Sequence, residues 1–130
     1  MKKALAIAGI LALTITPTAS FAGHKNCDER KIRPMSDLDH CNLENANLDN
    51  ARLSEAKLSN TNLRGANLKN ADLRGANLKN ANLLRANLKN ANLRNAKLTG
   101  GINYSRLKSC PKPSTLPEGW VCENNSLIQD

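Results

Sequence analysis

Four cysteines and two histidines are the side chains of this 130-residue chain that could do redox, metal or nucleophilic chemistry. They are His24, Cys27, His40, Cys41, Cys110 and Cys122. The four near the N-terminus could in principle surround zinc, because histidine and cysteine are both good zinc ligands. The alternative is that the cysteines form two disulfides, and the export signal described below favours disulfides.

A second metal hypothesis concerns His24 and depends on where the chain is processed. Cleavage after Ala22 would create the N-terminus Gly23-His24-Lys25. A free amine, the amide nitrogen of His24 and its imidazole can close fused chelate rings in a plane, which suits Cu(II). Copper binding is therefore kept as the alternative function, and no other cofactor is expected.

Motifs that would indicate an enzyme are missing from the sequence. It contains no HExxH, no glycine-rich phosphate loop and no GxSxG. A paired-carboxylate site could be imagined from Asp37 and Asp39, but two acids near the end of a solenoid are usually a solvated surface. We therefore expect a protein without catalytic activity.

Basic residues carry the remaining candidate chemistry, since the formal net charge is +8. Eight basic residues between positions 64 and 98 stand against one acid, Asp72, whereas acids gather earlier, at Asp39, Glu44 and Asp49. The candidate partner-binding residues are Arg64, Lys69, Arg74, Lys79, Lys89 and Arg94. They would bind a protein partner or an anionic envelope polymer. The alternative is that they only keep the protein soluble.

Residues 1–22 have the pattern of a bacterial signal peptide. Lys2 and Lys3 precede a short apolar run, and Ser20-Phe21-Ala22 places small residues at a cleavage site. The apolar run is about half the roughly 20 residues that a membrane span needs. We expect an exported protein, periplasmic or secreted, that begins at Gly23 and does not span a membrane.

The structural elements that must position these residues are formed by a sequence repeat with a period of five residues. Leucine stands at every fifth position from 38 to 98, and two places before each leucine is a small residue, usually alanine. On an α-helix five residues advance about 500°, so successive leucines would drift by about 140°. On a continuous strand, alternate leucines would point to opposite faces. The chain must therefore turn once per repeat, and Asn or Gly just after the leucine suits that bend.

The tract resembles the pentapeptide repeat family, whose motif is Ala-Asp/Asn-Leu-x-x. Ala66-Asn67-Leu68-Lys69-Asn70 and Ala71-Asp72-Leu73-Arg74-Gly75 match this motif fully. The resemblance implies an all-β fold, a right-handed quadrilateral β-helix of about three coils with four repeats per coil. Residues twenty apart would then stack, so two asparagine ladders are expected, through Asn47, Asn67 and Asn87 and through Asn42, Asn62 and Asn82.

This fold implies a domain organisation and a pairing of the cysteines. The solenoid would span 36–100, with irregular caps at 23–35 and 101–130. A solenoid of three coils would separate Cys27 and Cys41, at its start, from Cys110 and Cys122, beyond its end. The expected disulfides are therefore Cys27–Cys41 and Cys110–Cys122, each joining a cap to the solenoid. The tail from Cys110 to Cys122 resembles an extension found on some exported family members.

Nucleic acid is not expected as the partner. Some cytosolic members of the family resemble DNA in shape and charge and inhibit topoisomerases, which requires an acidic surface. Here the columns Lys69/Lys89 and Arg74/Arg94 have the opposite sign, and the repeats offer no aromatic platform for stacking bases. The sequence leaves the oligomeric state open.

Overall fold

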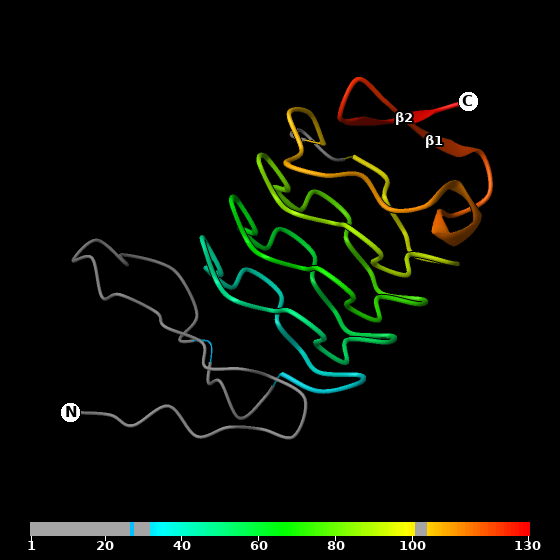
Figure 1. Cartoon of the computed structure of the whole chain (residues 1–130). Coiled ribbons are helices and arrows are strands. Elements are labelled where there is room, and N and C mark those ends of the chain that lie inside the picture. Colours follow the sequence, from blue (N-terminus) through cyan, green and yellow to red (C-terminus); the bar gives the residue numbers. More distant parts are fainter. Residues whose placement is uncertain (1–26, 28–31, 101–103) are drawn as a thin grey trace.

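The computed structural model describes Cys27, residues 32–100 and residues 104–130. Within this part, the repeats wind into a β-helix in which residues twenty apart lie side by side (Figure 1). Parallel β-bridges join Asp37 to Lys57, Asn42 to Asn62 and further pairs up to Asn77 and Lys97. Each coil of four repeats is therefore paired with the next coil along all four sides. The predicted signal segment and His24, the candidate copper ligand, lie outside the described residues.

Backbone hydrogen bonds between coils follow one rule. The N–H of Leu43 donates to the carbonyl oxygen of Asn62 at 2.8 Å, and the N–H of Asn62 donates back to Cys41 at 2.9 Å. The same exchange recurs at later repeats. Because these bonds run along the solenoid axis, successive coils lie about 4.8 Å apart, the spacing of neighbouring β-strands.

The bend in each repeat is made by a left-handed residue in the second position after the leucine. It is asparagine in seven of the repeats, as at Asn70 (φ 57°), and glycine in three, as at Gly65 (φ 66°). Both residue types enter this region at low cost, so the expected role of Asn and Gly in the bend is confirmed. The remaining three repeats have His40, Glu55 and Arg85 in this conformation, although Glu and Arg side chains give no such advantage.

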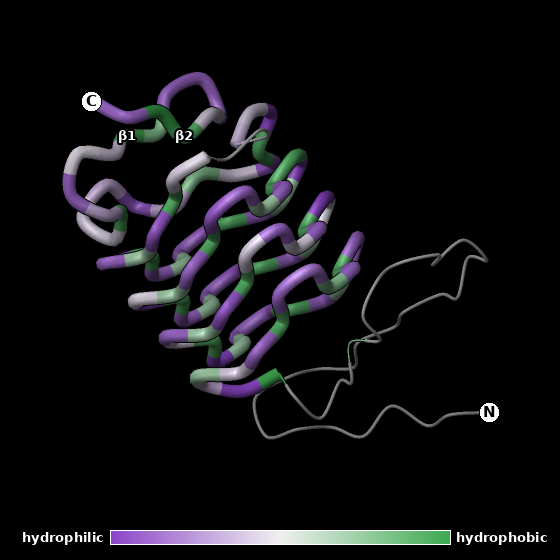
Figure 2. Tube along the Cα trace, turned by 180° about the vertical axis from the view of Figure 1, so that it is seen from behind, coloured by the Kyte–Doolittle hydropathy of each residue, from purple (hydrophilic) through white to green (hydrophobic). Residues whose placement is uncertain are grey.

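All thirteen leucines of the repeats are inside the solenoid, each at most 1% exposed. The small residue two places earlier shares this inward direction, and Figure 2 shows the resulting apolar stripes repeating from coil to coil. Thr61 replaces an alanine without leaving a buried polar group unpaired, because its hydroxyl donates to the carbonyl oxygen of Leu38 at 2.8 Å.

The segment after the repeats is more regular than the sequence predicts. It contains the short 3-10 helix η2 (Pro113–Thr115) and an antiparallel hairpin of β1 (Trp120–Glu123) and β2 (Ser126–Gln129). The hairpin turn is formed by Asn124 and Asn125, both with positive φ, which is the conformation that a two-residue hairpin turn requires. The expectation of an irregular segment missed this Asn-Asn signal.

The hairpin lies against the last coil of the solenoid (Figure 1). The N–H of Leu107 donates to Asn125, and the N–H of Leu127 donates to Tyr104. Leu107, Leu127, Tyr104 and Leu116 are all buried, and the ring of Trp120 meets that of Tyr104 edge-on at 5.8 Å. Leu116 and Trp120 therefore cover the apolar end of the solenoid.

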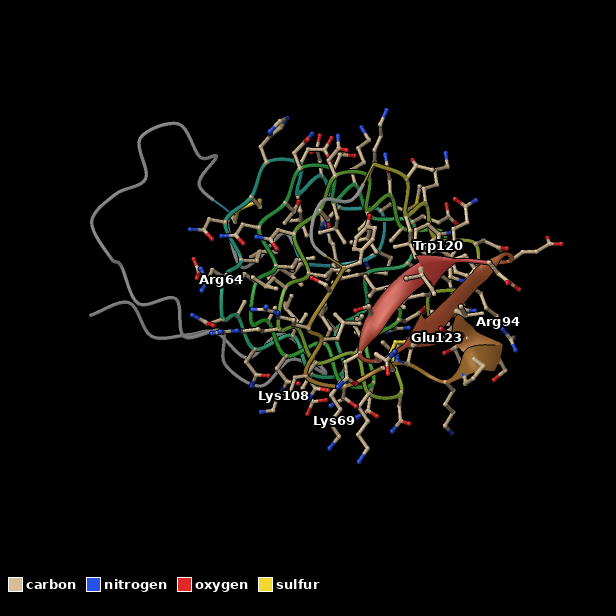
Figure 3. All side chains as sticks on the ribbon, turned by 90° about the horizontal axis from the view of Figure 1, so that it is seen from above. Arg64, Lys69, Arg94, Lys108, Trp120 and Glu123 are labelled. Atoms are coloured by element: carbon tan, nitrogen blue, oxygen red, sulfur yellow. A yellow bond between two sulfur atoms is a disulfide. The ribbon has the colours of Figure 1, made fainter. Side chains whose placement is uncertain are left out.

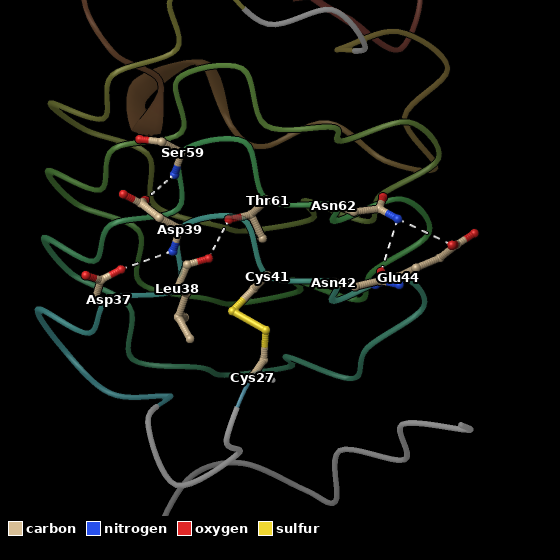
Figure 4. Close-up of a disulfide and its surroundings, with 10 residues drawn as sticks. All are labelled: Cys27, Asp37, Leu38, Asp39, Cys41, Asn42, Glu44, Ser59, Thr61 and Asn62. Carbon is tan, nitrogen blue, oxygen red and sulfur yellow. Dashed lines mark hydrogen bonds between the residues drawn. A yellow bond between two sulfur atoms is a disulfide. The ribbon is translucent and has the colours of Figure 1, made fainter. Parts of the chain in front are cut away.

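Both predicted disulfides are present. Cys27 is bonded to Cys41, with Cα atoms 5.6 Å apart, and Cys110 is bonded to Cys122, with Cα atoms 6.2 Å apart. Cys41 occupies the inward small-residue position of its repeat, so the bond to Cys27 approaches the core from the open end of the first coil (Figure 4). No helix within the described residues is long and apolar enough to cross a membrane.

Candidate anion-binding face

The six basic residues singled out by sequence are distributed over all four edges of the solenoid. Each of them directly follows a leucine, and such positions twenty apart fall on one edge. Lys69 and Lys89 share one edge, and Arg74 and Arg94 share the next. Arg64 and Lys79 lie on the two remaining edges. The sequence-predicted set is therefore not a single surface.

The arginines of this set already have partners within the protein. The Arg74 guanidinium donates two hydrogen bonds to the Asp72 carboxylate, at 2.7 and 2.8 Å. These bonds are the main reason that the pKa of Asp72 lies below its usual range. Arg64 lies 3.8 Å from Glu44, and Arg94 donates to the carbonyl oxygen of Ser114 at 2.9 Å. The charges of Arg74 and Arg64 are therefore partly offset within the protein, whereas the carbonyl bond of Arg94 orients its side chain without offsetting its charge.

The lysines of the set come from three identical repeats, Ala-Asn-Leu-Lys-Asn, at 66–70, 76–80 and 86–90. None of the three lysines has an acidic partner in the described part of the chain. The first and third of these identical repeats lie on one side of the coil and the second lies on the opposite side, so Lys69 and Lys89 stack on one edge. Lys79 lies on another edge, between Ser59 and Thr99. Identical local sequences are thus placed in different electrostatic surroundings.

The structure adds three basic residues to the side of the solenoid that carries Lys69 and Lys89. Arg85 lies on the neighbouring edge, and its N–H donates to the carbonyl oxygen of Arg106 at 3.1 Å, so these two residues are stacked. The N–H of Lys108 donates to Ala86, which places Lys108 over the middle of the same side. We call these five residues the basic face: Lys69, Arg85, Lys89, Arg106 and Lys108.

Figure 3, viewed along the stack from above, shows how this face is arranged. Arg64, Lys108 and Lys69 follow one another around one side of the ribbon, whereas Arg94 projects from another side. Arg64, paired with Glu44, lies at the margin of the basic face. All five members of the face are exposed or half-exposed. The face is therefore a strip with cations on both edges and along its centre.

The floor of the strip between the two edges is the predicted asparagine ladder. The amide of Asn67 donates to Asn47 at 3.1 Å, and the amide of Asn87 donates to Asn67 at 3.3 Å. Each of these side-chain oxygens also accepts the N–H of the residue two places on, as Asn67 does from Lys69. The second predicted ladder is confirmed between Asn42 and Asn62. The ladder holds the backbone next to each lysine in a fixed turn.

Sequence reasoning missed Arg85, Arg106 and Lys108 for identifiable reasons. Arg85 is in the second position after its leucine, whereas the predicted set contains only residues that directly follow a leucine. Arg106 and Lys108 lie beyond the repeats, where the five-residue period no longer predicts where a residue lies around the coil. There the pairing slips: Lys108 and Ser109 both oppose the single residue Asn87, the arrangement of a β-bulge.

The zinc alternative finds no support among the described residues. No group of three or more histidine, cysteine, aspartate or glutamate side chains in that part of the chain could hold a metal ion. Cys27 and Cys41, which the zinc hypothesis would use as ligands, are bonded to each other. The disulfide alternative is therefore the correct one for these two cysteines.

Comparison with known proteins identifies the family. The family model described as Pentapeptide repeats (8 copies) matches residues 36–65 and 66–101. The chain therefore belongs to the pentapeptide repeat proteins, which fold as right-handed β-helices and are generally non-enzymatic scaffolds. A search of curated proteins gave no match.

Two solved structures illustrate the similarity. A pentapeptide repeat protein of the Arabidopsis thaliana thylakoid lumen is 25% identical, with a TM-score of 0.52, over 72% of this chain and 69% of its own. A pentapeptide repeat protein from Nostoc PCC 7120 is 34% identical, with a TM-score of 0.49, over 68% of this chain and 78% of its own.

Proposed function

We propose that the protein is an exported, non-enzymatic scaffold that binds an anionic partner of the cell envelope, polymer or protein, through the basic face. The observation that carries this proposal is the gathering of five cations, none with an acidic partner among the described residues, on one side of a rigid solenoid. Such a surface attracts and orients an anion by summed point charges.

The backbone of two of these residues supports a binding role. Arg85 (φ 60°) and Arg106 (φ 52°) adopt the left-handed conformation that asparagine or glycine fills at most other repeats. A non-glycine residue there costs about 1 kcal/mol or more. Backbone strain of this kind is found where a side chain serves a function other than stability.

Export is proposed from the signal pattern of residues 1–22 together with the two disulfides, since disulfides persist in oxidising compartments. The related Arabidopsis protein is itself one of the thylakoid lumen. In this proposal the mature chain starts at Gly23, and the segments 23–35 and 101–130 close the two ends of the solenoid 36–100. Fractionation of the host, with mass spectrometry of the N-terminal peptide, tests both the compartment and the cleavage site.

Affinity capture from an envelope extract tests the binding function. The full chain is expressed and exported, and the purified protein is compared with a double variant, Lys69→Glu and Lys89→Glu. The control is Lys79→Glu with Lys97→Glu, which changes the charge equally on another side of the solenoid. A partner that is retained by the control and lost by the first variant supports the proposal. Equal capture by all three proteins contradicts it, provided that circular dichroism shows them folded.

A further inference from the structure

The cations of the basic face recur along the solenoid axis at the spacing of the coils. Lys69 and Lys89 are one coil apart, and Lys108 lies one level further, opposite Asn87 and Ala86. Arg85 and Arg106 repeat the arrangement on the other edge. The two cations on each edge are therefore about 4.8 Å apart at the backbone, since the coils keep β-strand spacing, and Lys108 lies between the two edges. A partner that follows this direction meets a cation at each coil from the second coil onward.

We propose that the basic face binds a linear polymer with phosphate groups in its backbone, and that the polymer lies along the solenoid axis. This inference rests on the proposed function and specifies its partner. A single phosphate can contact only the cations nearest to it, whereas a chain of phosphates gains one contact with each further coil. The axial repetition of the cations therefore favours a polymer over a small anion.

The side chains present suit phosphate. Lysine ammonium groups bind it as point charges, and arginine presents a fork of N–H donors that fits two phosphate oxygens. The asparagine ladder adds neutral donors between the two edges. Each amide nitrogen of Asn67 and Asn87 has two N–H groups, and the ladder uses one of them. The second can donate outward to an oxygen of the polymer.

The acids of the first coil distinguish a polymer from a membrane surface. Glu44 and Asp49 lie on the same two edges as the basic face, one coil before Arg64 and Lys69. If this side lay flat on an anionic bilayer, both carboxylates would be pressed against lipid phosphates. A flexible polymer avoids this repulsion because it can leave the face at the second coil. The first coil therefore sets one end of the proposed binding strip.

The test measures binding of inorganic polyphosphate to the full-length, exported protein, using chains of graded length. We expect the affinity to rise with chain length until the polymer spans the face, and to fall steeply with salt. Lys89→Gln should weaken binding about fivefold, the effect of one lysine near an anionic surface. Lys79→Gln is the matched control, since it lies in an identical pentapeptide on another edge, and it should leave the affinity unchanged.

Three outcomes would overturn the inference. The first is equal loss of affinity in Lys79→Gln and Lys89→Gln, which would mean attraction by net charge alone. The second is an affinity for inorganic phosphate equal to that for the longest chain. The third is tighter binding to phosphatidylglycerol vesicles, or to polygalacturonate, than to polyphosphate at equal charge. If this third result is lost in Lys69→Glu with Lys89→Glu, the proposed function stands and only the phosphate polymer is rejected.

Discussion

The hydroxyl of Tyr104 donates a hydrogen bond to the carbonyl oxygen of Leu78, 26 residues earlier in the chain, at 3.1 Å. Both residues are buried, so the bond is made away from water. It joins the C-terminal segment to the interior of the solenoid, at the end where the apolar core would otherwise meet solvent. Trp120 packs edge-on against the same ring, which connects the bond to β1.

Tyr104→Phe should lower the free energy of unfolding by about 0.5–1.5 kcal/mol, the usual net contribution of one hydrogen bond. The ring and its packing against Trp120 are kept, and the carbonyl oxygen of Leu78 still accepts the N–H of Ala81 at 2.9 Å, so the loss is that of the one bond. Urea unfolding of both proteins measures the difference. An unchanged midpoint would contradict the role given to this bond.

The same tyrosine predicts a loss of stability at alkaline pH. Burial raises the pKa of Tyr104 to about 12, whereas an unfolded tyrosine ionises near pH 10. The stability that this group contributes is therefore complete below about pH 10 and is lost as the pH rises through its folded value. The chain has one tyrosine, so its absorbance reports its ionisation directly. Tyr104→Phe, as the control, should lack this part of the alkaline loss.

The asparagine ladder can be measured by comparing identical repeats. Asn67→Ala removes one bond to Asn47, one from Asn87 and one from the N–H of Lys69. Asn77→Ala, in the same pentapeptide sequence, removes the corresponding turn bond from Lys79, but Asn77 lies between Lys57 and Lys97 and has no asparagine above or below it. Asn67→Ala should therefore destabilise the protein by about 1 kcal/mol more than Asn77→Ala. Equal thermal or urea midpoints would show that the ladder contributes nothing.

Arg85→Asn should increase stability and weaken anion binding together. Asparagine enters the left-handed region more easily, so the gain is expected at about 0.5–1 kcal/mol. The change also removes one cation from the basic face. Calorimetry and polyphosphate titration on the same sample test both effects. A variant that is more stable and binds equally well would show that Arg85 is not part of the binding surface.

The disulfide Cys110–Cys122 should stabilise the C-terminal segment by about 2–4 kcal/mol. The variant Cys110→Ala with Cys122→Ala should release the hairpin of β1 and β2 before the solenoid unfolds. Trp120, the single tryptophan of the chain, reports this step by its fluorescence. The comparison is Cys27→Ala with Cys41→Ala, which places alanine where most repeats have it. This second variant should leave the Trp120 signal in one transition with the rest of the solenoid.

The repeats were predictable because one physical requirement, returning every leucine to the inside, acts at each of them. The inward positions and the asparagine ladders follow from that period. The C-terminal segment was less predictable, because its turn at Asn124 and Asn125 stands outside the repeat and its strands are short. The basic face could not be read from the repeat sequence alone. Lys108 and Arg106 reach it through a slip in register, and Arg64 and Arg74 are drawn into ion pairs with Glu44 and Asp72.

The placement of three identical pentapeptides on different sides of the coil has a consequence for how such a protein changes during evolution. Insertion or deletion of one repeat would leave the core leucines in order but rotate everything beyond it by a quarter turn. Lys89 would then leave the side of Lys69, and the basic face would be dismantled although the leucine core was kept. Only gains or losses of four repeats at once preserve the alignment. The solenoid can therefore gain or lose whole coils of four repeats and still keep the columns of its surface residues aligned.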